Sequence, residues 1–281
     1  MQSGTLNLHV ISDGFWGLDA GAMFGMVPKT IWSKLPDVLV DERNRLYMGL
    51  NCLLIQDGKN NILIDAGLGK KFAPKFQDIY AVDQRKDLLA SLNPYCKPED
   101  INYLIFTHLH FDHAGGASYY NQTGQLKLTF PNADYIIQQK EWESAQNPDD
   151  KSQASYLSEN LEPLQESGRV RLINGNYRFN AHIELILTGG HSLGHQMVKI
   201  RSYGQTWLFA GDIFPTQNHI KPIYLTAYDL EPLETVKHKK MILETAVREN
   251  WLFFWEHNYC NVIGKIIVQK GKYQVVPSEI G

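Results

Sequence analysis

The sequence predicts a layered α/β fold, and three observations support this. Short apolar runs typical of buried strands alternate with stretches that suit helices, such as residues 101–106 and 234–250. The connections between them are short, and the chain has no internal repeat and no low-complexity segment. We expect a single domain over residues 1–281, because layered α/β domains often reach about 250 residues undivided.

The first half of the chain is expected to begin with a β-hairpin. Residues 52–55 and 61–65 are apolar runs, and the pair Asp57-Gly58 between them is a typical hairpin turn. The other elements expected before residue 150 are a helix near 84–92, strands at 101–106 and 134–139, and a helix at 140–145.

The second half contains three expected strands that each end in a residue able to bind a metal. These strands lie at 183–187, 207–210 and 252–255. Apolar spacing within residues 234–250 suits an amphipathic helix, and residues 265–276 resemble a closing hairpin. Candidate ligands therefore gather at strand ends.

Composition excludes several classes of protein. Lys and Arg number 27 against 30 Asp and Glu, a net charge of -3, and no basic run offers a footprint for a nucleic acid. The three cysteines form no CxxC pair, which argues against a disulfide framework and a thiolate zinc site. The N-terminus lacks a charged leader followed by an apolar run, and no stretch approaches the roughly 20 apolar residues of a membrane span. We expect a cytoplasmic protein that binds neither nucleic acid nor membrane.

Four side chains able to bind metal lie within six residues, directly after the strand at 101–106. They are His108, His110, Asp112 and His113. In an extended backbone, side chains two residues apart point the same way, so His108 and His110 can hold one ion while the other two turn toward a second. Zn²⁺ favours imidazole with some carboxylate. The alternative is a chance cluster on a solvated loop, which the preceding buried strand disfavours.

Two ions need further donors, and the strand ends offer His191, Asp212 and His257. Asp212 is the natural bridge, because its two oxygens can contact both ions of a pair held about 3.5–4 Å apart. Each has an alternative reading: His191 as a loop residue, with His195 competing as the ligand, Asp212 as a helix cap, and His257 as a structural residue.

Such a site predicts hydrolysis. Two divalent ions contribute four positive charges, and Asp112, Asp212 and one hydroxide contribute three negative ones. Metal binding lowers the pKa of water to about 7, which makes it able to attack a carbonyl carbon or a phosphorus at neutral pH.

The H-x-H-x-D-H string, followed in order by a later His, an Asp and a final His, resembles the metallo-β-lactamase fold superfamily over nearly the whole chain. The resemblance implies a four-layer αββα sandwich with a dinuclear site at the strand ends. It assigns His108, His110 and His191 to the first ion, Asp112, His113 and His257 to the second, and Asp212 to both. Asp65 matches a residue that orients a ligand, with a simple turn residue as the alternative.

Within the superfamily, the strings at 21–29, 210–212 and 227–230 are similar to the branch that contains N-acyl homoserine lactone lactonases and methyl parathion hydrolase. The resemblance implies a quorum-quenching lactonase with two divalent ions, most simply Zn²⁺, and a small-molecule lactone or ester as substrate. The N-terminal segment, about 14–48, would contribute to the substrate pocket. Its apolar side chains suit an acyl chain or aromatic leaving group, with core packing as the alternative: Met23, Phe24, Met26, Ile31 and Trp32. The same apolar segment makes a homodimer plausible.

The resemblance also implies that Asp112 passes a proton to the leaving alkoxide. Better-known lactonases of the branch carry a tyrosine three residues after the bridging aspartate, and this position is Pro215 here. His219 and Tyr224 are the candidates to replace it in polarising the carbonyl, and a structural role is the alternative for both.

Other functions are open to the same residues. A phosphotriesterase or arylesterase would use the same metals. A di-iron redox protein of this fold would carry Glu at the position of His110, and a non-catalytic binding module has little reason to keep seven ligands. The slight excess of acidic over basic residues disfavours a nuclease. The lack of an export signal disfavours a β-lactamase. A thioester hydrolase would be expected to end in a helical domain.

Overall fold

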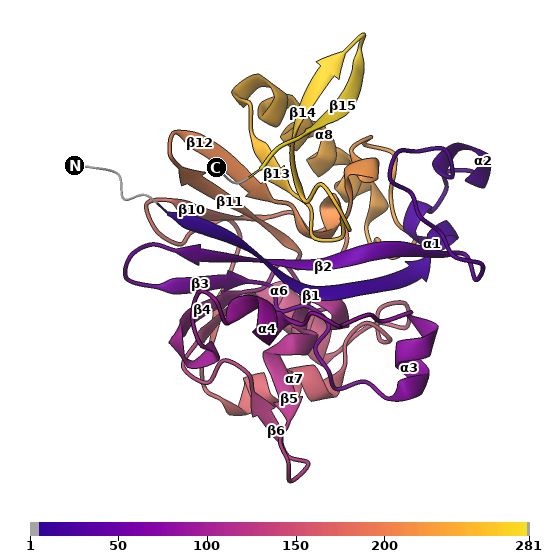
Figure 1. Ribbon diagram of the computed structural model, residues 1–281. Helices are drawn as coiled ribbons and strands as arrows, with labels where there is room; N and C mark the ends of the chain where they lie inside the picture. Colours follow the sequence, from indigo (N-terminus) through magenta and orange to yellow (C-terminus); the bar gives the residue numbers. More distant parts are fainter. Residues whose placement is uncertain (1–5, 280–281) are drawn as a thin grey trace.

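The computed structural model describes residues 6–279, which form two β-sheets packed face to face (Figure 1). The first sheet has the spatial order β1 (Asn7–Asp19), β2 (Arg45–Gln56), β3 (Asn61–Ile64), β4 (Ile101–Ile105), β7 (Asp134–Gln138) and β8 (Val170–Ile173). The second has the order β15 (Lys272–Pro277), β14 (Ile263–Gln269), β13 (Leu252–Phe254), β12 (Gln205–Phe209), β11 (Gln196–Ser202), β10 (Ile183–Leu187) and β9 (Tyr177–Arg178). A small separate sheet pairs β5 (Ser118–Tyr120) with β6 (Leu126–Leu128).

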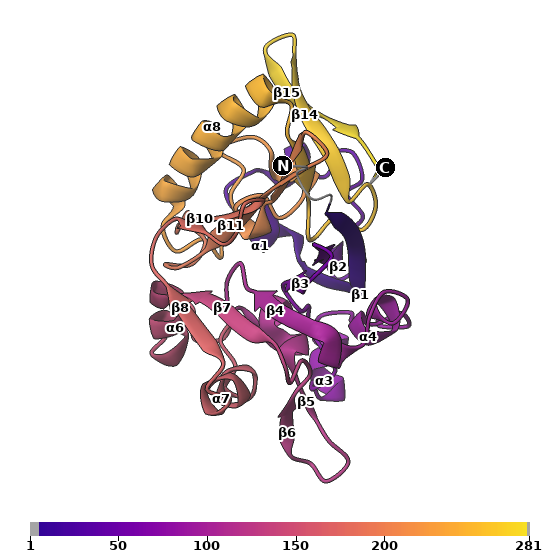
Figure 2. The ribbon, with the colours of Figure 1, turned by 90° about the vertical axis from the view of Figure 1, so that its left-hand side faces the viewer.

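Helices cover the outer faces of both sheets. The α-helices are α1 (Ala20–Phe24), α2 (Lys29–Trp32), α3 (Pro74–Ile79), α4 (Leu88–Leu92), α5 (Phe111–Ala114), α6 (Gln139–Gln146), α7 (Ser158–Glu166) and α8 (Pro232–Glu249). The short 3₁₀ helices are η1 (Pro98–Asp100), η2 (Gly115–Ala117), η3 (Gly211–Ile213) and η4 (Gln217–His219). Figure 2 shows α8 outside the second sheet, and α4, α6 and α7 on the far side of the first.

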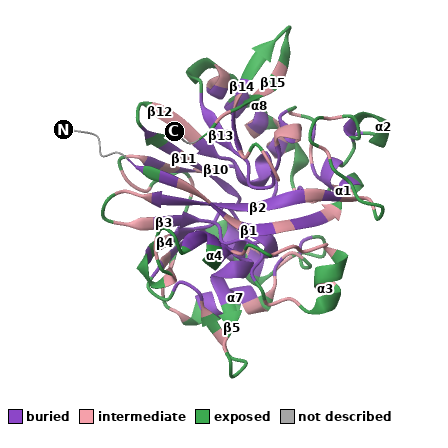
Figure 3. Cartoon of the chain, viewed as in Figure 1, coloured by how far each residue is buried: buried purple, intermediate pink, exposed green. Residues whose placement is uncertain are grey.

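Three apolar cores hold these layers together. Ile64 and Ile105 of the first sheet pack with Leu185 and Phe254 of the second, between the two sheets. A second core lies between the first sheet and its helices, and a third joins α8 to the second sheet. Figure 3 shows the buried strands inside and exposed residues on α2, α3 and the β14–β15 hairpin. The predicted αββα sandwich is confirmed.

The structure differs from the expected elements mainly at the N-terminus. We expected no strand before residue 52, but β1 runs for 13 residues and pairs along β2. Its register shifts between Ser12 and Phe15, where Gly14 takes a φ of 95°, so a turn-like Asp13-Gly14 sequence sits inside a strand as a bulge. The helix expected near 84–92 begins only at Leu88, because the Asp87 side chain caps it at the Ala90 N–H.

Other expectations hold closely. β2 and β3 form the expected antiparallel hairpin, and Asp57 Oδ1 accepts from the N–H groups of Lys59 and Asn60 in the turn. The helix expected at 234–250 is α8, and the closing hairpin is β14–β15. In the described part of the chain, no helix combines the length and the apolar character that crossing a membrane requires.

The strand directions bring the candidate ligands to one edge. β3, β4, β7 and β8 run parallel in the first sheet, and β12 runs parallel to β13 in the second. The segments that follow β4, β12 and β13 therefore leave the sandwich at carboxyl ends of strands, where ligands commonly bind in such folds.

Candidate metal centre

Three imidazoles form the first group of metal-binding side chains. His108 and His110 follow β4, and His191 lies in the loop between β10 and β11. One nitrogen from each lies within 4.8 Å of the others, and all three side chains are buried. His110 Nδ1 is 3.1 Å from His191 Nε2. His191 belongs to this group, and His195, the alternative candidate ligand, does not.

The second group combines Asp112 and His113 of α5 with Asp212 of η3 and His257, which follows β13. His257 Nε2 lies 3.5 Å from Asp112 Oδ2 and 3.2 Å from Asp212 Oδ1. His113 Nε2 lies 3.4 Å from Asp112 Oδ2. The structure thus brings together all seven side chains assigned to the two ions.

Asp212 lies between the two groups. Its Oδ2 is 3.3 Å from His191 Nε2 in the first group, and its Oδ1 is 3.2 Å from His257 Nε2 in the second. A carboxylate in this position can offer one oxygen to each of two ions, as the sequence led us to expect.

The far nitrogens of the imidazoles are held by hydrogen bonds. His191 Nδ1 lies 2.9 Å from Asp229 Oδ1, and His257 Nδ1 donates to the carbonyl oxygen of Gly49 at 3.0 Å. His113 Nδ1 lies 3.1 Å from Asp65 Oδ2 and 3.0 Å from Glu256 Oε2. Such partners fix the ring orientation and turn Nε2 toward the centre.

Asp65 also anchors the loop that carries the first ligands. Its two oxygens accept from the N–H of Thr107 at 2.7 Å and from the Thr107 hydroxyl at 2.6 Å. Asp65 takes a φ of 56°, an uncommon conformation for a non-glycine residue that the surrounding bonds maintain. Its position favours the orienting role over a simple turn residue.

Glu141 of α6 joins the two loops of the first group. Its Oε1 accepts from the Leu109 N–H and the Tyr156 hydroxyl, each at 2.9 Å. Its Oε2 accepts from the Ser192 hydroxyl at 2.6 Å and from the Gly194 N–H at 3.2 Å. The carboxylate therefore ties the backbone between His108 and His110 to the loop of His191.

The donor set fits a pair of divalent cations. Among the described residues, buried side-chain atoms without a hydrogen-bond partner include Nε2 of His108, His113 and His257 and Oδ1 of Asp212. Buried polar atoms are costly when unpaired, and these four belong to the two groups just described. Imidazole nitrogens with carboxylate oxygens are the ligands that Zn²⁺ and similar ions prefer.

The charges around the two groups favour the same conclusion. Burial and the neighbouring imidazoles lower the pKa of His108 and His110, so both rings are neutral, the form that binds a metal. At His113, burial lowers the pKa, but the carboxylates of Glu256, Asp112 and Asp212 more than offset this and raise it. An excess of carboxylates around the second group attracts positive charge.

Five of the seven candidate ligands border a cavity of about 140 Å³. His110, Asp112, His191, Asp212 and His257 form its floor. Its walls combine apolar side chains with hydroxyl groups and one ammonium group: Trp16, Leu18, Met23, Tyr80, Phe111, Lys151, Ala154, Ser155, Thr226 and Tyr228.

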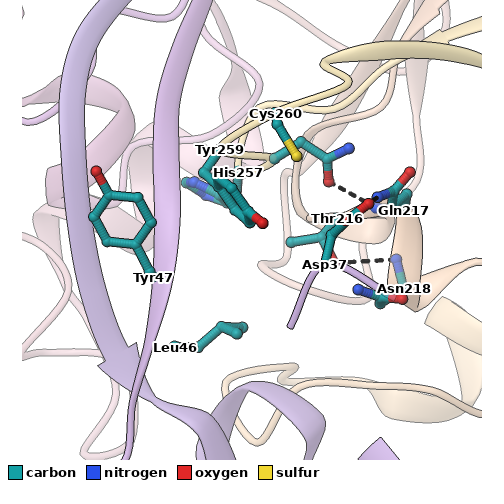
Figure 4. Close-up of a pocket in the computed structure, with 10 residues that line it drawn as sticks. Asp37, Leu46, Tyr47, Thr216, Gln217, Asn218, His257, Tyr259 and Cys260 are labelled. Atoms are coloured by element: carbon teal, nitrogen blue, oxygen red, sulfur yellow. Dashed lines mark hydrogen bonds between the residues drawn. The ribbon is translucent and has the colours of Figure 1, made fainter. Parts of the chain in front are cut away.

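A second, much smaller cavity lies on another side of His257 (Figure 4). Its volume is about 10 Å³, and it is lined by polar groups such as Thr216, Gln217 and Asn258 together with Tyr47 and Tyr259. A space of this size holds about one water molecule, so it cannot take a substrate.

The structure places only one of the five apolar residues expected to contact the substrate in the wall of the larger cavity. Met23 lies there, whereas Phe24 and Trp32 are buried and stack on each other with ring centroids 5.2 Å apart. Met26 is 79% exposed. Core packing, the alternative for these apolar residues, describes Phe24 and Trp32.

The two residues considered as substitutes for the missing tyrosine also lie elsewhere. His219 uses both ring nitrogens, with Nδ1 2.8 Å from the Thr216 hydroxyl and Nε2 2.9 Å from the Met23 carbonyl oxygen. The Tyr224 hydroxyl accepts from Lys221 Nζ at 3.0 Å. Neither residue lines the cavity, so we do not retain either as the group that polarises the carbonyl.

Sequence reasoning missed most of the residues that support the ligands. Glu141 and Glu256 have no metal-binding motif of their own, and both are fully buried carboxylates. Of the residues that were missed, Asp229 had a signal in the sequence, because it lies in the string at 227–230 that resembles the lactonase branch.

Comparisons with known proteins agree with this geometry. Residues 48–247 match the family model of the metallo-beta-lactamase superfamily. An N-acyl homoserine lactonase from Bacillus cereus is 28% identical over 76% of this chain and 83% of its own length.

Solved structures give the same result. A probable metal-dependent hydrolase from Staphylococcus aureus is 32% identical, with a TM-score of 0.88 and full coverage of both chains. AidC, a dizinc quorum-quenching lactonase in complex with a hydrolysis product, shares the fold with a TM-score of 0.79 at 19% identity, over 100% of this chain and 97% of its own. This protein therefore belongs to the metallo-β-lactamase superfamily and is an enzyme of its hydrolase class.

Proposed function

We propose that the enzyme opens the ring of a lactone, specifically an N-acyl homoserine lactone, with two Zn²⁺ ions as its cofactors. The observation that carries the proposal is the convergence of five histidines and two aspartates, of which three histidines and both aspartates form the floor of a cavity whose walls are largely apolar. The similarity to a curated lactonase over most of both chains supports the same substrate class.

The first ion would be held by His108, His110 and His191, and the second by Asp112, His113 and His257, with Asp212 shared. Such ions polarise a carbonyl group and lower the pKa of water to about 7. All other steps depend on side chains of the chain itself.

Asp112 is the side chain we propose to move the proton. It lines the cavity, and its Oδ2 lies 3.4 Å from His113 Nε2 and 3.5 Å from His257 Nε2. A carboxylate on the floor of the cavity can take a proton from the attacking water and give it to the ring oxygen that leaves as an alkoxide.

Tyr228 is the hydroxyl we propose to orient the substrate carbonyl. It lines the cavity with Tyr80, and among the described residues neither hydroxyl is used in a hydrogen bond. Burial, with Tyr80 and the charge of Asp112 nearby, raises the pKa of Tyr228 to about 12, so the group stays a donor at neutral pH. A donor aimed at developing negative charge is a common source of catalysis.

Trp16, Met23 and Phe111 supply an apolar wall suited to the acyl chain. Trp16 and Phe111 meet edge to face, with ring centroids 5.9 Å apart, which makes this wall rigid.

The test compares turnover of three substrates by the zinc-loaded enzyme: an N-acyl homoserine lactone, an aryl ester and an aryl phosphotriester. We expect about two zinc ions per chain and the largest kcat/KM for the lactone. The Asp212→Ala variant should lose both metal and turnover. A much larger kcat/KM for the phosphotriester, or unchanged metal content in Asp212→Ala, would overturn the proposal.

The second candidate is an arylesterase or phosphotriesterase with the same metal ligands. The aromatic wall formed by Trp16, Tyr80 and Phe111 favours it, because such a wall can stack against an aryl leaving group. The substrate comparison above decides between the two.

We also propose a homodimer that pairs through the N-terminal segment, where Met26 and Ile31 expose 79% and 48% of their surface. Sedimentation at several protein concentrations tests it, and a monomer at all concentrations would contradict it. The cytoplasm as the place of action stays a prediction.

A further inference from the structure

Lys151 lies in the segment that joins α6 to α7, and this segment forms one side of the cavity. Asp149 shapes it, because its Oδ1 accepts from the N–H groups of Lys151 and Ser152 at 2.8 and 3.0 Å. Ser155 then accepts from the Phe111 N–H at 2.9 Å through its carbonyl oxygen. The segment is thus fixed against α5, which carries two of the ligands.

Lys151 lines the cavity, and its ammonium group is held at one point of the wall. Its Nζ donates to the carbonyl oxygen of Asp229, the residue whose carboxylate orients His191. An ammonium group has three N–H donors, and this is the only acceptor found for it among residues 6–279. No described carboxylate forms an ion pair with Lys151, and the side chain is exposed, so two donors are available to a ligand.

Lys151 is also the only lysine or arginine among the residues that line this cavity. A cavity of about 140 Å³ places any bound lactone ring within a few ångströms of all its walls. A substituent on the carbon next to the reacting carbonyl must then lie close to Lys151 or to the apolar side chains of the wall.

We propose that Lys151 determines specificity by donating a hydrogen bond to an oxygen of the substituent on the carbon next to the carbonyl under attack. This inference rests on the proposed lactone hydrolysis and names the side chain that recognises the substituent. The favoured lactones carry an acylamino or carboxylate-bearing substituent, and unsubstituted lactones are poor substrates because they leave the ammonium without its ligand.

The test measures KM and kcat for three lactones: γ-butyrolactone, N-butanoyl homoserine lactone and N-succinyl homoserine lactone. The Lys151→Met variant keeps most of the side-chain length and removes the charge, Lys151→Arg keeps the charge, and Lys140→Met removes an exposed lysine of α6 that does not line the cavity. Zinc content and the unfolding midpoint are measured for every variant.

In Lys151→Met, KM should rise about tenfold for the two substituted lactones, the size expected when a hydrogen bond from a charged donor is lost. The KM for γ-butyrolactone and all three kcat values should stay within about twofold, Lys151→Arg should restore most of the loss, and Lys140→Met should match the wild type. A larger rise for the succinyl than for the butanoyl compound would identify a carboxylate as the preferred acceptor, and equal rises the amide oxygen.

An equal rise in KM for all three lactones would overturn the proposal, because Lys151 would then only hold the segment in place. Unchanged KM values would overturn it as well. If the wild-type enzyme hydrolyses no lactone, the proposed function fails separately. The same variants are then assayed with aryl esters that carry or lack an acylamino group beside the carbonyl, which still decides the role of Lys151.

Discussion

His195 Nε2 accepts a hydrogen bond of 3.0 Å from the backbone N–H of Asp212, so this histidine positions Asp212 and stands outside both groups of candidate ligands. On the other side of the ring, Nδ1 lies 2.7 Å from the Thr188 hydroxyl, which sets the tautomer. Gly211 makes the approach possible: it takes a φ of 51°, and a Cβ there would lie 2.6 Å from His195 Nε2. A side chain at position 211 would push Asp212 away from the centre.

Replacing His195 with alanine should weaken zinc binding and lower kcat about 10-fold to 100-fold, the range typical for partners that position a metal ligand. Competition with a chelator measures the affinity, and His195→Gln should recover part of it through its acceptor oxygen. The matched control is His219→Ala, because His219 is equally buried and bonded but stands apart from the ligands. It should lower stability and leave two ions bound. Full zinc affinity in His195→Ala would contradict the assignment.

Glu141→Gln should lower the free energy of unfolding by about 2–3 kcal/mol and weaken binding of the first ion. The two oxygens of Glu141 accept four hydrogen bonds, so an amide nitrogen in place of either oxygen faces donors where an acceptor is required. Urea unfolding with and without chelator measures both effects.

The control for Glu141 is Glu143→Gln on the same helix. Glu143 is exposed and accepts from Gln139 Nε2 at 2.7 Å, so its loss should change stability by less than about 0.5 kcal/mol. Similar losses in the two variants would show that the network around Glu141 has no special role.

Tyr228→Phe should reduce kcat about 100-fold with little change in zinc content, because it removes one hydroxyl donor from the cavity and nothing from the ligands. Tyr224→Phe is the comparison, since its hydroxyl is bound to Lys221 outside the cavity. Equal kcat values for the two variants would remove Tyr228 from the reaction.

Lys239 should make stability depend on pH. Its side chain is 1% exposed, and burial lowers its pKa to about 7, with only Asp229 opposing this effect. The unfolded chain, with a lysine pKa of about 10.4, then binds more protons than the folded one between pH 7 and pH 10, so stability rises with pH in this range. Relative to Lys239→Met, the wild type should gain about 2 kcal/mol of unfolding free energy between pH 7 and pH 9.

Urea unfolding at matched pH values, with the same zinc concentration, measures this difference. The variant leaves the Tyr224 carbonyl oxygen without its hydrogen-bond partner, which lies at 2.6 Å in the wild type. Because this loss applies at every pH, it does not change how the stability difference between the two proteins depends on pH. Parallel stability curves for the two proteins would mean that Lys239 keeps its charge throughout.

The ligands could be predicted from the sequence because each is a metal-binding residue type at the end of an apolar run. The H-x-H-x-D-H string made four of them visible locally, and strand ends indicated His191, Asp212 and His257. Residue type and spacing alone left His195 as an alternative to His191, and the family resemblance favoured His191. In the structure the two histidines that follow β10 differ in their hydrogen-bond partners.

The cavity wall was harder to predict, because apolar residues in one segment divide between core and pocket according to packing. Met23 reaches the cavity, and its neighbour Phe24 turns inward to stack on Trp32. Lys151 and Tyr80 come from segments without any motif, and only the path of the chain brings them to the site. We did not predict β1 because the turn-like sequence at its bulge interrupts the strand pattern.

The candidate metal ligands and the proposed substrate contacts come from different parts of the chain. The ligands leave the edges of the two sheets, whereas Trp16, Met23, Tyr80, Lys151 and Tyr228 belong to connecting segments or a sheet margin. Replacements in the cavity wall would then change the substrate preference and leave the seven candidate ligands intact. Substrate choice and metal binding can therefore be altered independently in this fold.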